Sequence, residues 1–282
     1  MKTDISSIII PAHNEEAVIE RTLKVLLRDA ASKEFEVIVV CNGCHDNTAE
    51  IVKSSFNEIT VIVLEKASKT AAINAGLKKV RGQSVLLLDA DIELDTTSAR
   101  LLFRAVKEPG IEAAIGHMAI DTNGAGALVR AFYRVWLHHP YLLHGKFAAA
   151  IAISREGLRR VGMLREVIAD DTYLRRLIPA NRVKLLASVC FRVRVPRTLK
   201  ALIQVRSRSY KGNRQLAKQM ANTQETYTGE ALGLIRRVAG RPSLWPSALV
   251  YFAVTLAARY RSHQQHGVRW ERDLTTRSRL AE

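Results

Sequence analysis

Residues 85–95 constrain the fold of this chain more than any other segment. They read Val-Leu-Leu-Leu-Asp-Ala-Asp-Ile-Glu-Leu-Asp, a short apolar run that ends abruptly in acidic residues. Residues 85–88 are typical of a strand that is buried on both faces, as in a parallel sheet. An unpaired carboxylate is costly in an apolar core. We therefore expect Asp89 and Asp91 at the C-terminal end of that strand, where an open α/β sheet has its ligand crevice.

Asp89 and Asp91 also indicate a metal site. Side chains two residues apart on an extended segment point the same way, so the two carboxylates repel each other unless a cation or a proton lies between them. Mg²⁺ is commonly held by one or two carboxylates together with substrate phosphates. One interpretation is therefore a metal shared with a diphosphate. The other is a strand end followed by an acidic turn that starts a helix, and these two residues alone leave both open.

Strands and helices alternate through the first 120 residues. Apolar runs predict strands at 5–10, 35–40, 59–64, 85–88 and 112–120, and helical spacing predicts helices between them, the first with Asn14 as its N-cap. This order predicts an α/β fold with a doubly wound, mostly parallel sheet. No dinucleotide-binding Gly-x-Gly-x-x-Gly follows the first strand, and no P-loop motif occurs. The polar residues that could do chemistry all follow strands: Asn14, Asn42, Asp46, Lys69, Asp89 and Asp91.

The second half of the chain is more helical and much more basic. A strand is predicted at 147–153, a helix capped by Ser154 follows it, and Asp170-Asp171 open another helix. Apolar and polar residues alternate over 183–195, which predicts one long strand or two. From Thr198 onward the sequence predicts helix. Residues 151–282 hold 26 Lys and Arg against 9 Asp and Glu, which predicts an anionic partner: a membrane surface, a nucleic acid or a phosphorylated substrate.

Cysteine usage and the N-terminus indicate a cytoplasmic protein. Three cysteines, Cys41, Cys44 and Cys190, do not make a disulfide framework, and Cys41-x-x-Cys44 has no second ligand pair at zinc spacing. Residues 1–7 are too polar for a signal peptide, and no apolar stretch reaches the roughly 18 residues of a spanning helix.

Five segments of the chain stand out together: Ser7-Ile-Ile-Ile-Pro-Ala-His-Asn-Glu-Glu16, Val39-Val-Cys-Asn-Gly-Cys-His-Asp-Asn-Thr48, Lys69-Thr-Ala-Ala-Ile-Asn74, Asp89-Ala-Asp91 and Asp170-Asp171. In order and in spacing, over about residues 5–215, they resemble the family-2 glycosyltransferases of GT-A fold. The resemblance implies a GT-A catalytic domain at 1–215, with a nucleotide-binding half at 1–120 and an acceptor half at 121–215, followed by a helical, basic extension at 216–282.

The resemblance also implies how a nucleotide-diphosphate sugar is bound. Asn42 stands where the family usually has acidic residues, which leaves the nucleobase open, since an amide both donates and accepts hydrogen bonds. Lys69 and Arg208 match positions near the diphosphate, and Asn74 is expected to buttress the loops. The first loop, whose backbone is expected to meet the base and ribose, comprises Pro11, Ala12, Asn14 and Glu15.

The family pattern further assigns the metal and the catalytic base. Asp91 would bind Mg²⁺ or Mn²⁺, and Asp89 would share the metal or contact the ribose or sugar. Asp171 matches the general base, with Asp170 beside it, and one step with one base predicts inversion at the anomeric carbon. The alternative for Asp170 and Asp171 is helix capping. The resemblance thus implies an inverting, metal-dependent hexosyltransferase that acts on an acceptor hydroxyl.

The C-terminal helix predicted at 244–261 is apolar almost all round, with Arg at its end. It suits the membrane interface, on the cytoplasmic face, and equally a packed core or a dimer contact. A lipid-linked or membrane-proximal acceptor would match the first placement, and no specific nucleic acid is expected. Two other functions compete with sugar transfer: a nucleotidyltransferase that makes sugar nucleotides, and a non-enzymatic basic module that binds membrane or nucleic acid.

Overall fold

The computed structural model describes residues 5–140, 142, 147–220 and 227–264. The chain divides into two compact units, which are described separately. The first unit comprises Met1–Ala119, Phe147–Glu166 and Asp170–Val193, and the second Ile120–Lys146, Val167–Ala169 and Arg194–Glu282.

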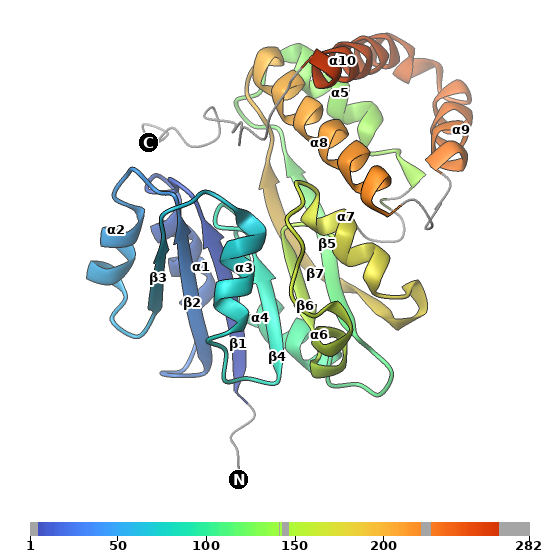
Figure 1. The fold of residues 1–282 in the computed structure, drawn as a ribbon. Helices are drawn as coiled ribbons and strands as arrows, with labels where there is room; N and C mark the ends of the chain where they lie inside the picture. The colour runs from blue at the N-terminus through green and yellow to red at the C-terminus, as the bar shows by residue number, and fades with distance from the viewer. Residues whose placement is uncertain (1–4, 141, 143–146, 221–226, 265–282) are drawn as a thin grey trace. The chain divides into compact units, whose positions relative to one another are not determined.

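A seven-stranded sheet in the order β3-β2-β1-β4-β6-β5-β7 organises the first unit (Figure 1). β1 pairs in parallel with β2 and β4, and β2 pairs in parallel with β3. The predicted doubly wound, mostly parallel sheet is therefore confirmed. These four strands span Ser6–Ala12 (β1), Phe35–Asn42 (β2), Thr60–Leu64 (β3) and Ser84–Leu88 (β4).

Helices connect the parallel strands: α1 (Ile19–Leu27), α2 (Thr48–Ser55), α3 (Lys69–Leu77) and α4 (Thr96–Ala105). α3 packs on β1 and β2, and a Cβ added at Gly76 would lie 2.7 Å from Ile9 Cγ2, so only glycine allows this approach. α1 begins later than predicted. Asn14 does not cap it, because Asn14 has a φ of +50° and forms part of a turn, and the helix N-cap is Val18.

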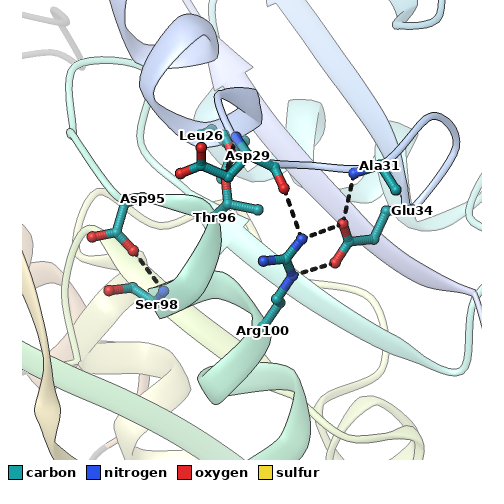
Figure 2. Close-up of polar contacts among 8 residues, drawn as sticks. All are labelled: Leu26, Asp29, Ala31, Glu34, Asp95, Thr96, Ser98 and Arg100. Atoms are coloured by element: carbon teal, nitrogen blue, oxygen red, sulfur yellow. Dashed lines mark hydrogen bonds and ion pairs between the residues drawn. The ribbon is translucent and has the colours of Figure 1, made fainter.

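The start of α4 is anchored to the end of α1 (Figure 2). The buried Thr96 hydroxyl donates to the Leu26 carbonyl at 2.8 Å, and Arg100 holds Glu34 through two bonds of 2.6 and 2.8 Å. Asp95 caps the helix by accepting from the Ser98 amide at 2.6 Å. Because α4 begins five residues after Asp91, this anchor fixes the C-terminal end of the segment that carries Asp89 and Asp91.

On the other side of the sheet, one strand runs against the direction of its two neighbours. β6 (Ala150–Ile153) pairs antiparallel with β4 and with β5 (Ala113–Asp121), and β7 (Val183–Arg194) is one long strand. The predicted strand at 147–153 starts late because Ala149 has a φ of +67° and the Ala150 amide donates to the Ala148 carbonyl at 2.7 Å, which closes a three-residue turn. α6 (Arg155–Val161), α7 (Asp170–Leu177) and a 3₁₀ turn (Ala180–Arg182) complete this side.

Glu112 ties three of these elements together at the start of β5. Its fully buried carboxylate accepts from Arg160 at 2.5 and 2.8 Å and from Arg182 at 3.0 Å. The bond to Arg160 holds the pKa of Glu112 below its usual range, although burial opposes this shift. The carboxylate therefore stays ionised and links β5, α6 and the 3₁₀ turn.

The second unit is helical. α10 (Trp245–Gln264) packs along α5 (Ala127–Trp136) and α8 (Leu199–Gln219), and the unit also contains α9 (Tyr227–Ala239) and a 3₁₀ turn (Pro242–Leu244). Phe132 stacks on Tyr251 with ring centroids 4.9 Å apart, and Arg206 lies 5.3 Å from the centre of the Tyr210 ring. Among the described residues, no helix is long and apolar enough to cross a membrane.

Candidate active site

Lys69 joins two of the acidic segments that the sequence singles out. Its ammonium lies 2.7 Å from Asp89 Oδ1 and 2.9 Å from Asp170 Oδ2. Lys69 is the first residue of α3, Asp89 follows β4, and Asp170 is the first residue of α7. The Lys69 side chain is 19% exposed and that of Asp170 is 12% exposed. The fold of the first unit therefore brings three predicted site residues into one ionic cluster.

The cluster carries more negative than positive charge. Burial lowers the pKa of Lys69, but Asp170 and Asp89 outweigh it, so this pKa is raised and the ammonium stays charged. Burial raises the pKa of Asp89, and the charges of Asp170 and Asp91 add to that rise against the opposing effect of Lys69. Asp91 thus lies within electrostatic range of Asp89, and a further cation would relieve the repulsion among the carboxylates.

Two backbone contacts position the Asp89–Asp91 turn. The fully buried hydroxyl of Thr22 on α1 donates to the Ala90 carbonyl at 2.9 Å. The Asp89 amide donates to the Ala149 carbonyl at 2.8 Å, which comes from the turn with positive φ. Neither Thr22 nor Ala149 is recognisable from the sequence. Thr22 reads as an ordinary helical residue, and alanine gives no sign of a left-handed backbone.

Asp171 lies next to the cluster in the chain, and its backbone forms the first turn of α7. Its Oδ1 accepts from the Thr172 amide at 2.7 Å, and the residue is half-buried. This contact is to the adjacent residue within α7, and not the N-cap contact to an amide two or three residues further on, so helix capping also stays a prediction. The role of Asp171 as general base stays a prediction. The expected contact of Arg208 with the diphosphate also stays a prediction, and Arg208 lies on α8 in the second unit.

The loops after β1 and β2 are bonded to each other. Asn14 Oδ1 accepts from the His45 amide at 2.6 Å, and the Glu15 amide donates to Thr48 Oγ1 at 2.7 Å. Asp46 Oδ1 accepts from the same Thr48 hydroxyl at 2.6 Å, at the start of α2. These bonds join the two loops at the C-terminal ends of β1 and β2.

The Asn42 side chain is buried between these loops and does not face solvent. It is 2% exposed, its amide nitrogen donates to the Ala12 carbonyl at 2.7 Å, and its Oδ1 accepts from the Ser68 amide at 3.0 Å. Both ends of the amide are thus engaged with backbone. In this conformation Asn42 holds the end of β1, where Pro11 and Ala12 are buried, and the start of α3 in place.

Asn74 ties α3 to the segment that leads toward α7. Its Nδ2 donates to the Leu164 carbonyl and its Oδ1 accepts from the Leu164 amide, both at 2.8 Å. This is the buttressing role expected from the sequence. It fixes the helix that starts with Lys69.

The acidic residues suit a metal that takes part of its ligands from a bound substrate. Within the described ranges, no group of three or more His, Cys, Asp or Glu side chains could hold a metal alone. Asp89 and Asp91 supply carboxylates that repel each other, and one oxygen of Asp89 already contacts Lys69. Two carboxylates at the open edge of a sheet are a normal protein contribution to Mg²⁺ when phosphate oxygens complete the coordination. The residues present therefore fit such a metal.

Comparison with known proteins identifies the family. The family model described as "Glycosyl transferase family 2" matches residues 7–167, more than half of the chain. The chain belongs to glycosyl transferase family 2. This membership favours a glycosyltransferase over the nucleotidyltransferase and the non-enzymatic module considered from the sequence.

Solved structures show the same GT-A fold. The mannosyltransferase PcManGT from Pyrobaculum calidifontis, in complex with GDP-Man and Mn²⁺, has a TM-score of 0.63 and 18% identity, over 93% of this chain and 88% of that one. The glucosyl-3-phosphoglycerate synthase of Mycobacterium tuberculosis, in complex with Mn²⁺ and UDP-Glc, has a TM-score of 0.56 and 19% identity, over 79% and 81%. At these identities the likeness concerns the fold alone.

Curated relatives match only part of the chain. The undecaprenyl-phosphate 4-deoxy-4-formamido-L-arabinose transferase of Shewanella sediminis is 33% identical over 97 residues, 32% of this chain and 29% of the relative. The dolichyl-phosphate beta-glucosyltransferase of Trichomonas vaginalis is 29% identical over 154 residues, 49% of this chain and 48% of the relative. The chain thus spans less than half the length of these relatives.

Proposed function

We propose that this glycosyltransferase moves a hexosyl group from a nucleotide-diphosphate sugar to an acceptor hydroxyl, with inversion at the anomeric carbon. The observation that carries the proposal is the ionic cluster of Lys69, Asp89 and Asp170. It lies in the first unit, where α3 and α7 begin close to the C-terminal end of β4, the central strand of the sheet. This end of the strands is where open α/β sheets bind their ligands.

Asp91 and Asp89 hold a divalent cation, Mg²⁺ or Mn²⁺, in this proposal. The cation, when bound, neutralises charge that builds on the leaving nucleoside diphosphate. The Lys69 ammonium contributes a second positive charge near the diphosphate. The crowding of Asp89 by Asp91 and Asp170 supports this assignment, because it is relieved by a cation. The Mn²⁺ in the complexes of two fold neighbours agrees with it.

The two acids of α7 have different roles in this proposal. Asp170 is bonded to Lys69 and orients the start of the helix, so it is a positioning residue. Asp171 accepts the proton of the acceptor hydroxyl as general base. In this proposal the reaction uses one base and no covalent intermediate, so a single displacement inverts the anomeric configuration.

The acceptor in this proposal is lipid-linked or membrane-proximal, and the enzyme works at the cytoplasmic face of a membrane. The support is that two relatives are named for undecaprenyl phosphate and dolichyl phosphate. The sugar and nucleobase are left to experiment, since the Asn42 amide is engaged with backbone.

A thermal-shift panel of UDP, GDP, TDP and CDP, each with and without Mn²⁺, tests the donor site. A ligand that binds only the native state raises the melting temperature. We expect a Mn²⁺-dependent rise with one nucleotide for the wild type, none for Asp91→Asn, and the full rise for the control Asp29→Asn, an exposed acid at the end of α1. If folded wild-type protein shows no shift with any nucleotide, the proposal fails.

A further inference from the structure

α10 presents an apolar stripe to solvent. Between Trp245 and Ala258, every residue of this helix that is exposed is apolar. Leu249 is 76% exposed and Leu256 is 71% exposed. The exposed residues of this stretch are Trp245, Pro246, Leu249, Phe252, Ala253, Leu256 and Ala257.

The stripe is not needed to pack the helix. Trp245, Leu249, Phe252 and Leu256 are spaced by four, three and four residues, so they lie on one face. The opposite face, which includes Tyr251, is buried and packs on α5 and α8. Large apolar side chains gathered on one exposed face mark an interaction surface rather than a scattered surface residue.

The surroundings of the stripe are positively charged. The residues of the second unit include 20 Lys and Arg against 6 Asp and Glu, a net charge of +14, whereas those of the first unit include 23 against 21, a net charge of +2. No acidic residue occurs between 232 and 264. Arg236, Arg237 and Arg241 precede the stripe, Arg259 follows it, and all four are exposed.

We propose that the apolar stripe of α10 lies in the headgroup region of a membrane that contains anionic lipid. The apolar side chains enter the acyl boundary, and the arginines at both ends meet the headgroups. Trp245 begins the stripe and the exposed Tyr260 follows it, and both are side chains that favour this boundary. A second copy of the chain is a poorer occupant, because it would bring together two units that each have a net charge of +14. A nucleic acid would leave the apolar side chains unused.

Vesicle flotation of the full chain tests the proposal. The probes are vesicles of phosphatidylcholine alone and vesicles with about a third phosphatidylglycerol, at low and high salt. We expect binding to the anionic vesicles at low salt that weakens with salt, as screening of the arginines requires. The double variant Leu249→Gln/Leu256→Gln should bind at least about tenfold more weakly, because it removes apolar burial. Arg236→Gln should lower the affinity for anionic vesicles about fivefold, which is the typical effect of one basic residue at an anionic surface.

The matched control is Val63→Thr/Met163→Gln, which removes two exposed apolar side chains from the first unit. It should bind like the wild type, and all variants should keep the wild-type melting temperature. Equal binding by the α10 double variant, or no binding by the wild type to anionic vesicles, overturns the proposal. A wild-type dimer in light scattering that the α10 variant converts to a monomer would also overturn it, in favour of self-association. None of these outcomes depends on the donor panel, so failure here and failure of the proposed function are distinguishable.

Discussion

Ala149 has a positive φ, which is uncommon for a residue other than glycine, and it stands beside the site. Its φ of +67° lies in the region that favours glycine, and its carbonyl accepts from the Asp89 amide. Such strain is often found where a structure must hold a functional group in one place. Here it fixes the first carboxylate of the Asp89–Asp91 turn.

Substitution at Ala149 tests that role. Ala149→Val should lower the free energy of unfolding by about 1–3 kcal/mol, because a β-branched residue tolerates this φ poorly, whereas Ala149→Gly should be tolerated. Urea unfolding measures both effects, and nucleotide binding reports whether Asp89 has moved. A valine variant as stable as the glycine variant would mean that the turn relaxes at no cost.

Asp170 and Asp171 are adjacent, yet their contacts differ, and this predicts different kinetics. Asp171→Asn should lower kcat by about 10²–10⁴-fold and leave nucleotide affinity unchanged, since only proton transfer is lost. Asp170→Asn removes a partner of Lys69 and should change nucleotide affinity as well. Steady-state kinetics and nucleotide titration separate the two. If Asp171→Asn keeps wild-type kcat, the base lies elsewhere.

At the scale of the element, Glu112 shows how a buried charge holds β5 against the elements beside it. β5, α6 and the 3₁₀ turn after α7 meet at one carboxylate with two arginines. These arginines are partly exposed, whereas Glu112 is not, so the carboxylate depends on them for compensation of its charge.

Glu112→Gln should destabilise the protein by roughly 1–3 kcal/mol at pH 7. The pKa of Glu112 is depressed in the folded state, so its contribution is present above the unfolded pKa of about 4.3 and is lost as pH falls through the folded pKa. The difference in melting temperature between variant and wild type should therefore shrink below about pH 4.

Glu156→Gln provides the control, because Glu156 pairs with Arg182 at 3.4 Å but is largely exposed. Its effect should stay below about 1 kcal/mol at every pH. A Glu112→Gln variant whose deficit does not change with pH would show that packing, not charge, is lost.

At the scale of the whole molecule, the parallel half of the sheet could be predicted because its signals are local. Each strand is a short apolar run, Ser68 caps α3, and Ser154 caps its helix as predicted. The positions of the acids after β4 and at the start of α7 could be predicted for the same reason. The antiparallel pairing of β6 could not, since nothing local to residues 150–153 specifies its partners or their direction.

The residues of the candidate site could be named from the sequence, whereas their geometry could not. Lys69, Asp89 and Asp170 are distant in the chain, and their ion pairs depend on how α3, β4 and α7 are placed. The amide of Asn42 was expected to face a ligand, whereas it bonds two backbone groups, because a buried amide must satisfy both its donor and its acceptor. These contacts join segments that are far apart in the chain, so they can be seen in the folded structure but not in the sequence.

The two contacts that hold the Asp89–Asp91 turn reach backbone atoms, the Ala90 carbonyl and the Asp89 amide. Side-chain changes at Asp91 therefore leave this scaffold untouched. Under the proposed metal role of Asp91, Asp91→Asn is expected to give a folded protein that does not transfer the sugar. Such a version could be immobilised to retain its acceptor from a cell extract without consuming it, which would turn the acceptor from an unknown into a molecule that can be isolated and weighed.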